Sequence, residues 1–240
     1  MIHNPSRSYK PFLRHLSSFM MTAVMALCAL VLLPGCDDND ADLGEVNPAV
    51  QNLLQLDGEG NGSTRFLLYT PGATEPQVLT TTSQLQLPED AFMGETYLVA
   101  YTAADINAPT TAISVRGLAR ITNANLQRGT QDDLEGWDSD PVWVTSIWRA
   151  GSKIDMRLML TYDEMPRRFA LMVDEATLGE EYPTAYLIHQ RQTSSASFQR
   201  QYYASFQCKA FWEQTEAKGL RIRVNNANDP SKNEFTVLRP

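Results

Sequence analysis

Cysteine is scarce in this chain of 240 residues, which has only three. Removal of the first 35 residues as a signal would leave Cys36 and Cys208, and Cys36 lies in a lipidation motif described below. Cys208 then has no cysteine partner, so the sequence predicts no internal disulfide. Cys208 lies in an apolar-rich stretch, which favours a buried structural thiol over a nucleophile.

Histidine is equally scarce, and His189 is the one imidazole beyond residue 35. Zinc sites of the His/Cys kind need several such ligands, so we expect no metal site of this kind and no cofactor. A Ser-His-Asp or Cys-His site would have to use His189. Its strand-like surroundings predict a half-exposed structural histidine. Carboxylate-pair hydrolysis stays open, but no spacing singles out a pair, and we expect no enzyme.

Positively charged residues are also few, since the chain has 20 Lys and Arg against 28 Asp and Glu, for a net charge of −8. Nucleic-acid binders normally carry a basic footprint, so we expect no nucleic-acid partner. The glycine-rich segment from Gly58 to Ser63 lacks the Gly-Lys-Ser/Thr end of a phosphate loop. Its Asn61-Gly62 pair predicts a tight hairpin turn instead.

Long apolar runs are absent except near the start of the chain. Three basic residues and no acidic residue precede an apolar run from Phe19 to Leu33, which is shorter than the ~20 residues of a membrane helix. The run ends in Leu33-Pro34-Gly35-Cys36, which resembles the bacterial lipobox. The resemblance implies that residues 1–35 are a lipoprotein signal peptide and that Cys36 carries the lipid. An ordinary signal peptide with a chance cysteine is the alternative.

Acidic residues follow Cys36 directly, among them Asp37, Asp38 and Asp40. Like charges keep a segment extended, so residues 36–45 predict a solvated tether. The segment also resembles the acidic export signal of Bacteroidota surface lipoproteins. That resemblance implies a protein anchored to the outer membrane by its lipid and facing outward, with the periplasmic face as the alternative.

Residues 46–124 predict a small β-barrel, because short apolar or β-branched runs alternate with proline and glycine breaks and no helical period appears. The expected strands are 51–56, 65–69, 78–82, 84–87, 96–102 and 112–121.

Residues 125–140 predict an acidic linker between two domains. Asp132, Asp133 and Glu135 lie in this segment with few apolar residues, and acidic linkers tend to extend. A cation site with Asp138 and Asp140 as ligands is the alternative.

Residues 141–240 predict a β-sandwich. The segment 154–162 has a period of two, with Ile154, Met156 and Leu158 on one face. Asp155 and Arg157 lie on the other face, which we expect to be wet. The expected strands are 142–147, 154–162, 168–173, 185–191, 198–208, 220–224 and 234–238. The predicted fold class is therefore all-β, with a small barrel followed by an antiparallel sandwich.

All four tryptophans lie at or beyond residue 137, and the ordinary explanation is that they fill and cover the sandwich core. The alternative is an aromatic platform for a sugar or a protein partner. On that hypothesis Trp143, Trp148 and Trp212 are the candidate ligand contacts.

The segment Asp140 to Trp148, followed by Gly151 and by Ile154-Asp155-Met156, resembles the opening of the C-terminal domain of the NigD-like lipoproteins of Bacteroidota. Ile113 to Ile121 resembles the last strand of that family's OB-like N-terminal domain, and Leu220 to Val224 resembles its penultimate strand. The resemblance implies an OB-like barrel, a sandwich and no catalytic signature. A bacteriocin-immunity role has been suggested for the family.

Two functions of different classes follow from these observations. The first is a non-enzymatic envelope lipoprotein that binds a protein partner as an immunity or accessory factor. The second is a surface lipoprotein that binds carbohydrate, which the tryptophans suggest.

Overall fold

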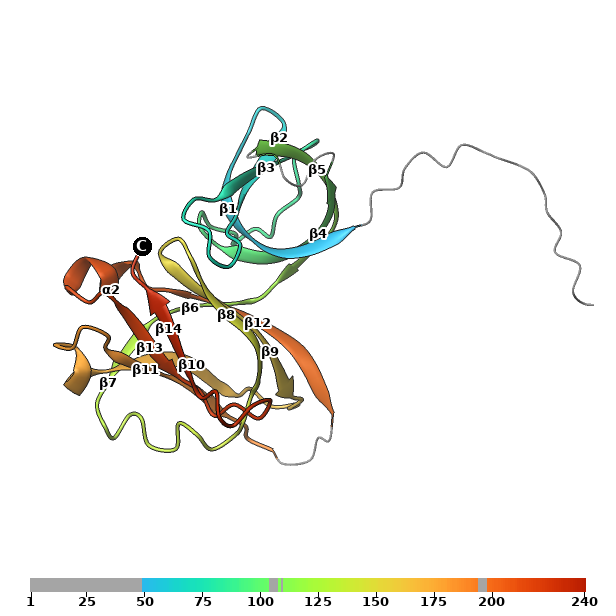
Figure 1. Ribbon diagram of the computed structural model, residues 1–240. Coiled ribbons are helices and arrows are strands. Elements are labelled where there is room, and N and C mark those ends of the chain that lie inside the picture. The colour runs from blue at the N-terminus through green and yellow to red at the C-terminus, as the bar shows by residue number, and fades with distance from the viewer. Residues whose placement is uncertain (1–48, 104–107, 109, 194–197) are drawn as a thin grey trace, which may run out of the picture. The chain divides into compact units, whose positions relative to one another are not determined.

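The computed structural model describes residues 49–103, 108, 110–193 and 198–240 (Figure 1). The predicted signal peptide, Cys36 and the acidic tether with Asp37, Asp38 and Asp40 lie outside these residues. In the described part, strands dominate, and the helical elements are α2 (Lys209–Gln214) and the 3-10 turn η1 (Glu175–Thr177). No helix within these residues is both long and apolar enough to cross a membrane.

The first five strands close into a barrel in the order β1-β2-β3-β5-β4, with β1 also paired to β4 (Figure 1). All neighbouring pairs are antiparallel except β3 and β5, which run parallel. This closed five-stranded barrel confirms the expected OB-like architecture. The strands are β1 (Val50–Gly60), β2 (Ser63–Leu68), β3 (Gln77–Thr81), β4 (Thr96–Ala103) and β5 (Thr110–Arg120).

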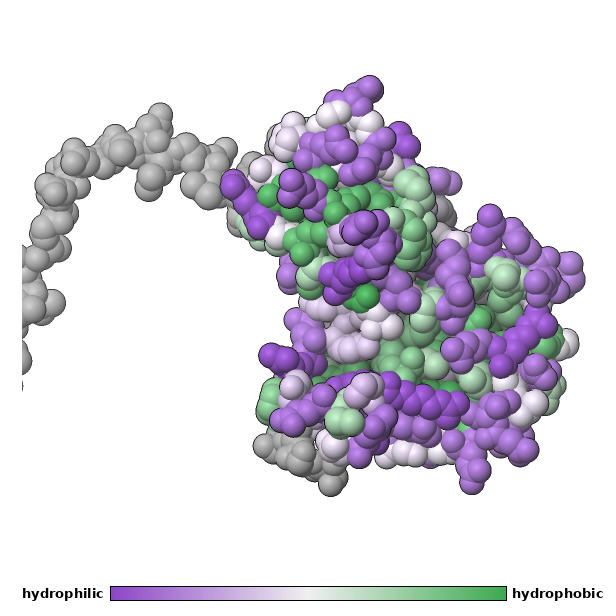
Figure 2. Space-filling view, turned by 180° about the vertical axis from the view of Figure 1, so that it is seen from behind, coloured by the Kyte–Doolittle hydropathy of each residue, from purple (hydrophilic) through white to green (hydrophobic). Residues whose placement is uncertain are grey.

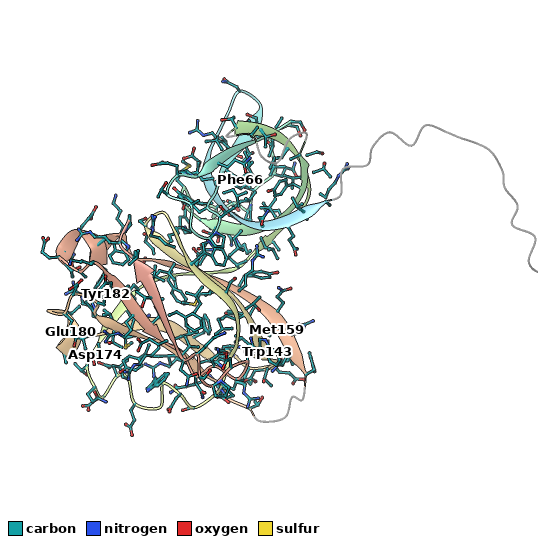
Figure 3. All side chains as sticks on the ribbon, viewed as in Figure 1. Phe66, Trp143, Met159, Asp174, Glu180 and Tyr182 are labelled. Atoms are coloured by element: carbon teal, nitrogen blue, oxygen red, sulfur yellow. The ribbon has the colours of Figure 1, made fainter. Side chains whose placement is uncertain are left out.

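The barrel interior is filled by aromatic and aliphatic side chains. Phe66 points into the ring of strands (Figure 3), and Tyr97 and Tyr101 are fully buried with it. The predicted strand at 84–87 is wrong. Instead of joining the sheet, this segment packs Leu85 and Leu87 against the barrel core, and the Leu85 backbone N–H donates to Thr64 Oγ1 at 3.0 Å.

The hairpin between β1 and β2 confirms the predicted turn at Asn61-Gly62. Asn61 has φ of 54° and Gly62 has φ of 74°, both in the left-handed region. A two-residue turn with two positive φ values matches the right-handed twist of the flanking strands, which is why Asn-Gly is favoured there.

The second part of the chain is a sandwich of two sheets, which confirms the expected fold class (Figure 1). The four-stranded sheet has the order β6-β12-β9-β8, and the five-stranded sheet has the order β14-β13-β11-β10-β7. Most pairs are antiparallel, but β6–β12, β7–β10 and β11–β13 are parallel. The strands are β6 (Thr122–Asn125), β7 (Gln127–Gly129), β8 (Trp143–Ala150), β9 (Lys153–Thr161), β10 (Arg168–Asp174), β11 (Thr184–Gln190), β12 (Gln199–Gln207), β13 (Gly219–Arg223) and β14 (Glu234–Leu238).

The alternation in β9 directs Ile154, Met156 and Leu158 into the core between the two sheets, as the sequence predicts. Leu171 and Leu187 meet them from the five-stranded sheet. Cys208 lies in the same cluster and is buried, which confirms the predicted structural thiol.

The acidic segment 125–140 is not the extended linker that its composition predicts. β7 pairs with β10, and Leu134 and Trp137 then pack on the outer face of the five-stranded sheet. Asp133 accepts hydrogen bonds from the backbone N–H and the hydroxyl of Thr130, which closes the first turn of the segment. The segment is therefore held on the sheet by these apolar contacts together with hydrogen bonds from Arg168 and Gln190 to its backbone carbonyls.

The chain passes from the barrel to the sandwich through a single residue, Ile121. β5 ends at Arg120 in the barrel, and β6 begins at Thr122 in the four-stranded sheet. The predicted boundary at 124 therefore differs from the structure, because β6 already belongs to the sandwich.

Candidate functional site

The barrel and the sandwich meet along a small apolar cluster, called here the junction. Leu53 of β1 packs with Trp148 and Ala150 of β8, and Tyr69 and Tyr203 lie against them. The Trp148 indole N–H donates to the Tyr69 carbonyl at 3.1 Å. The junction covers part of the outer face of the four-stranded sheet, so this face is not the wet face expected from the alternation of β9.

A chain of hydrogen bonds between buried side chains runs beside this cluster. The Lys153 ammonium donates to the Gly94 carbonyl and, at 3.0 Å, to Thr96 Oγ1. Thr96 donates at 3.1 Å to Ser205 Oγ, which donates at 2.6 Å to Asp155 Oδ1. Strand register explains the arrangement, because Asp155 and Ser205 are cross-strand partners and Lys153 lies two residues along the same face.

Both ionisable ends of this chain have shifted pKa values. Burial raises the pKa of Asp155 to about 6, although the Ser205 hydrogen bond and the Lys153 charge oppose the shift. Burial lowers the pKa of Lys153, and the carboxylates of Asp155 and Glu95 oppose that shift. Perturbed ionisable groups beside a cavity are a physical indication of a functional site.

Asn123 joins the two parts through backbone groups. Its side-chain oxygen accepts from the Thr96 backbone N–H at 2.8 Å, and its amide nitrogen donates to the Thr96 carbonyl at 2.9 Å. The amide therefore satisfies both backbone groups of Thr96, much as a neighbouring strand would.

The loop at residues 88–95, called here the rim loop, is held firmly at its base. Glu95 is buried, accepts a hydrogen bond from the Tyr97 hydroxyl and forms an ion pair with Arg120 at 3.3 Å. Arg120 also forms a bidentate pair with Asp90 at 2.7 and 2.9 Å. Burial, with the Glu95 hydrogen bond, raises the pKa of Tyr97 to about 12. Gly94 has φ of 86°, which the turn of the loop requires.

The tip of the rim loop exposes two large apolar side chains, Phe92 at 57% and Met93 at 62%. Both line a cavity of about 260 Å³ whose other walls carry amide, hydroxyl and ammonium groups. Met93 also lines a second hollow of about 390 Å³ on the barrel. The lining of the first cavity is Phe92 to Gly94, Asn123 to Asn125, Lys153, Ser205 and Gln207. In Figure 2, apolar residues reach the surface among hydrophilic ones over both parts of the molecule.

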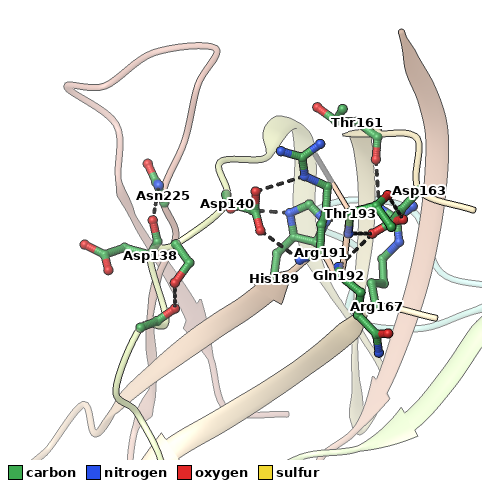
Figure 4. Close-up of polar contacts among 12 residues, drawn as sticks. Asp138, Asp140, Thr161, Asp163, Arg167, His189, Arg191, Gln192, Thr193 and Asn225 are labelled. Atoms are coloured by element: carbon green, nitrogen blue, oxygen red, sulfur yellow. Dashed lines mark hydrogen bonds and ion pairs between the residues drawn. The ribbon is translucent and has the colours of Figure 1, made fainter. Parts of the chain in front are cut away.

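His189 lies on β11 as predicted, but it is buried, with 1% exposure, rather than half-exposed. Its Nδ1 lies 3.3 Å from the Asp140 carbonyl, and its Nε2 lies 3.1 Å from Arg167 Nη1 (Figure 4). Burial and the Arg167 charge lower the pKa of His189, which favours a neutral ring that donates to the carbonyl and accepts from Arg167. Among the described residues, neither ring nitrogen contacts a hydroxyl or a thiol.

Asp140 is paired with a side chain of the sandwich. Its two carboxylate oxygens accept from the Arg191 backbone N–H at 2.7 Å and from Arg191 Nε at 2.9 Å (Figure 4). The Asp138 carbonyl accepts from Asn225 at 2.6 Å. No cluster of three or more His, Cys, Asp or Glu that could hold a metal ion occurs within the described ranges.

The three candidate tryptophans lie in different surroundings. Trp143 is 41% exposed on β8, next to its cross-strand neighbour Met159 (Figure 3). Trp148 is buried at the junction but lines a further cavity. Trp212 is buried in the sandwich core, so its ring has no free face for a ligand.

Sequence reasoning did not find the rim loop or the buried polar chain. Phe92 and Met93 stand alone between turn residues, where no periodicity marks them. Asp155 and Lys153 alternate with apolar residues in the usual pattern of a wet face, and their burial depends on a barrel more than fifty residues earlier in the chain. Gly94, whose φ is 86°, is a local sign of a turn in the rim loop.

No family model matches the chain, and neither does any curated protein. Several solved structures share its fold. A protein of unknown function, DUF1344, from Bacteroides vulgatus is 14% identical, with a TM-score of 0.62 over 80% of this chain and 92% of its own. A candidate lipoprotein from Bacteroides fragilis is 11% identical, with a TM-score of 0.57 over 80% of this chain and 99% of its own.

A NigD-like immunity protein from Bacteroides caccae is 15% identical, with a TM-score of 0.51 over 78% of this chain and 90% of its own. The resemblance to the NigD-like family expected from the sequence is therefore confirmed at the level of the fold. At these identities the likeness extends to the fold alone.

Proposed function

We propose that this chain is a NigD-like lipoprotein, anchored to the outer membrane and facing the outside of the cell, that binds a protein partner without catalysing a reaction. The observation that carries the proposal is the rim loop, which holds Phe92 and Met93 exposed on a rigid base. Large exposed apolar side chains on a preorganised loop are the usual anchors of protein interfaces.

The surroundings of the rim loop support a protein ligand. Met93 stands between hollows of about 260 and 390 Å³, so a partner surface can enclose it from both sides. The polar groups lining the first hollow, including Asn125 and Gln207, can form the hydrogen bonds that orient such a partner. An immunity or accessory role is the form of partner binding that the NigD-like resemblance suggests.

The anchor and the export signal belong to the same proposal. Cys36 would carry the lipid, and Asp37, Asp38 and Asp40 would direct the protein to the cell surface. Two or more acyl chains hold a protein on a membrane for long times, because each buried CH₂ adds ~0.8 kcal/mol. A partner outside the cell would then meet the barrel within reach of a short tether.

The absence of catalysis is supported by the two residues that a nucleophilic mechanism would need. The ring of His189 is held by Arg167 and the Asp140 carbonyl, and Cys208 is buried in the core. Burial raises the pKa of the Cys208 thiol to about 12, which keeps it protonated and unreactive at neutral pH.

The proposal is tested by photocrosslinking in intact cells. A benzophenone amino acid replaces Met93 in the full-length protein, and the control replaces Leu238, which is 59% exposed on β14. We expect one discrete crosslinked protein at position 93 and none at position 238. The same protein should co-purify with Leu238→Ser but not with Phe92→Ser. Equal crosslinking at both positions, or no discrete product at position 93, would overturn the proposal.

Carbohydrate binding is the second candidate, and the exposed ring of Trp143 favours it. Indole faces stack on the apolar faces of sugar rings, and Met159 extends the apolar surface beside it. A glycan that changes the tryptophan fluorescence of the wild type but not of Trp143→Phe would favour this function.

A further inference from the structure

A separate cavity at the junction, of about 160 Å³, shares no lining residue with the cavity beside the rim loop. Its barrel side is formed by Asn52 and Leu53 of β1 and by the segment Leu68 to Pro71. Its sandwich side is formed by Ser146 and Trp148 of β8 and by Arg157 of β9. The walls therefore combine apolar side chains with one cation.

The guanidinium of Arg157 is only partly satisfied. It lies over the Trp148 ring, 5.6 Å from the ring centroid, and its Nη2 donates to Asn52 Oδ1 at a long 3.3 Å. Its Nε is buried and has no hydrogen-bond partner. A guanidinium has five N–H donors, and Asn52 Oδ1 is the one acceptor that the described residues offer to them. A buried donor without an acceptor is costly, which is why such groups usually have a partner.

No acidic side chain lies in the lining of this cavity to pair with Arg157. Arg157 also forms no salt bridge with any residue of the described chain. Asp155 lies two residues away on the same face of β9, and the Arg157 charge lowers its pKa, but its Oδ1 accepts a hydrogen bond from Ser205 and none from Arg157. A cavity lined by one cation and no acidic residue is a local exception in a protein of net charge −8.

The hydroxyl groups of Tyr69, Thr70 and Ser146 contribute to the polar lining of the cavity. Those of Ser146 and Thr70 form no hydrogen bond to another described residue. The apolar walls are supplied by Leu53, Leu68 and Trp148. A ligand for this cavity therefore needs one negative charge, acceptors for a planar guanidinium and hydroxyls, and a small apolar body.

We propose that this cavity binds a small organic carboxylate, with the carboxylate on the Arg157 guanidinium and the Ser146 hydroxyl and with its body against Leu53 and Trp148. A carboxylate matches the planar fork of arginine. A doubly charged phosphate would leave one charge uncompensated, because Arg157 is the one cation in the lining. The proposal does not depend on the protein partner of the rim loop.

The test observes the Trp148 indole N–H by NMR in the full-length protein in nonionic micelles, with Trp148→Phe to assign the signal. The probes are sodium propionate against neutral propionamide, and sodium glucuronate against glucose, at constant ionic strength. We expect at least one carboxylate to shift the signal saturably while its neutral counterpart does not. Propionate reports a simple acid and glucuronate a sugar acid, so the two arms separate the sources of the carboxylate.

Three variants connect the signal to the cavity. Arg157→Gln should weaken carboxylate binding about tenfold or more, since the charge-assisted hydrogen bonds are lost. Ser146→Leu should abolish binding by filling the cavity while Arg157 remains. Arg149→Gln, an arginine of β8 outside the lining, should bind like the wild type. Unchanged signals from the other three indoles would show that each variant is folded.

Any of three results would overturn the proposal. In the wild type, these are a carboxylate that shifts the indole signal no more than its neutral counterpart does, for both pairs of probes, or no shift from either carboxylate. The third is wild-type binding in both Arg157→Gln and Ser146→Leu. Because every probe is a small molecule, none of these outcomes bears on crosslinking at Met93.

Discussion

Asp155 and Lys153 are buried side chains connected through two hydroxyl groups rather than by direct contact. Each hydroxyl accepts one hydrogen bond and donates the next, so the donors run in one direction from the ammonium to the carboxylate. Each hydroxyl thus has a partner both as donor and as acceptor, and such a connected polar network favours one arrangement of its groups. Burial of the carboxylate still has a cost, which appears in its raised pKa.

The first prediction concerns the pH dependence of the free energy of unfolding, which follows from the burial of the Asp155 carboxylate. The pKa of Asp155 is about 6 in the folded protein, against 3.8 for an ordinary aspartate. Protonation of Asp155 therefore favours the folded state, and its contribution to the free energy of unfolding is fully present below pH 3.8. This contribution, about 3 kcal/mol in total, is lost as the pH rises through 6. Asp155→Asn should remove this loss, so the free energy of unfolding should fall less between pH 4 and pH 7 than in the wild type.

The measurement is urea unfolding at several pH values across this range. Asp132→Asn, a substitution in the exposed part of the acidic segment, is the matched control and should follow the wild-type curve. Parallel curves for Asp155→Asn and the wild type would show that the buried carboxylate does not titrate in this range.

For single residues, the sequence predicts burial or backbone conformation in some cases and not in others. Burial of Cys208 and the turn at Asn61-Gly62 could be predicted because each depends on near neighbours in the chain. Burial of His189 and Asp155 could not, because the groups that cover them come from distant segments. A polar side chain in an alternating strand has the same local pattern whether water or another part of the molecule covers it.

At the scale of elements, β13 and β14 pack so closely that Gly219 has no room for a side chain. A Cβ added to Gly219 would lie 2.5 Å from the Val237 carbonyl oxygen and 3.2 Å from Leu238 Cα. Both are backbone atoms of the neighbouring strand, so no rotation of a side chain can relieve the contact.

The second prediction follows from this approach of the two strands. Gly219→Ala should destabilise the protein by about 1–3 kcal/mol, because an extra methyl group in a close-packed site forces the backbone apart. Gly60→Ala is the control, since no atom lies within 4 Å of a Cβ built there. Thermal unfolding of both variants is the measurement, and equal melting temperatures would contradict the prediction.

The strands themselves were largely predictable. All seven strands expected in the sandwich segment 141–240 are present, because each is a short apolar or β-branched run bounded by turn residues, and 154–162 and 220–224 also have a clear period of two. The segment 84–87 was misassigned because its apolar residues pack on the barrel without pairing to a strand. β7 was missed because three residues are too few to show a period.

At the scale of the whole molecule, the junction combines an apolar cluster, a buried polar chain and a side-chain amide that satisfies the backbone of β4. These contacts belong to one compact unit that extends from Asn47 to Pro240. The barrel and the sandwich should therefore unfold together, as a single cooperative unit.

The third prediction weakens this coupling. Leu53→Ala removes a buried side chain from the junction, at a cost of about 2–5 kcal/mol. The measurement is hydrogen exchange of β4 and β9 peptides in increasing urea. In the wild type both should lose protection at the same urea concentration, whereas in Leu53→Ala β4 should lose it first.

Leu171→Ala, in the sandwich core and outside the junction cluster, is the control. It should lower the urea concentration for both peptides together. A Leu53→Ala variant in which both peptides still lose protection together would show that the junction is not what couples them.

The passage of the chain through Ile121 has a consequence for how such a protein can evolve. In many proteins made of two parts, a linker tolerates insertions, and the parts can be exchanged by recombination. Here a one-residue insertion after Ile121 would shift β6 by one position and turn Asn123 to the opposite face of the sheet, away from Thr96. We therefore expect the barrel and the sandwich to be inherited together, with new specificities arising from substitutions on loops and cavity walls.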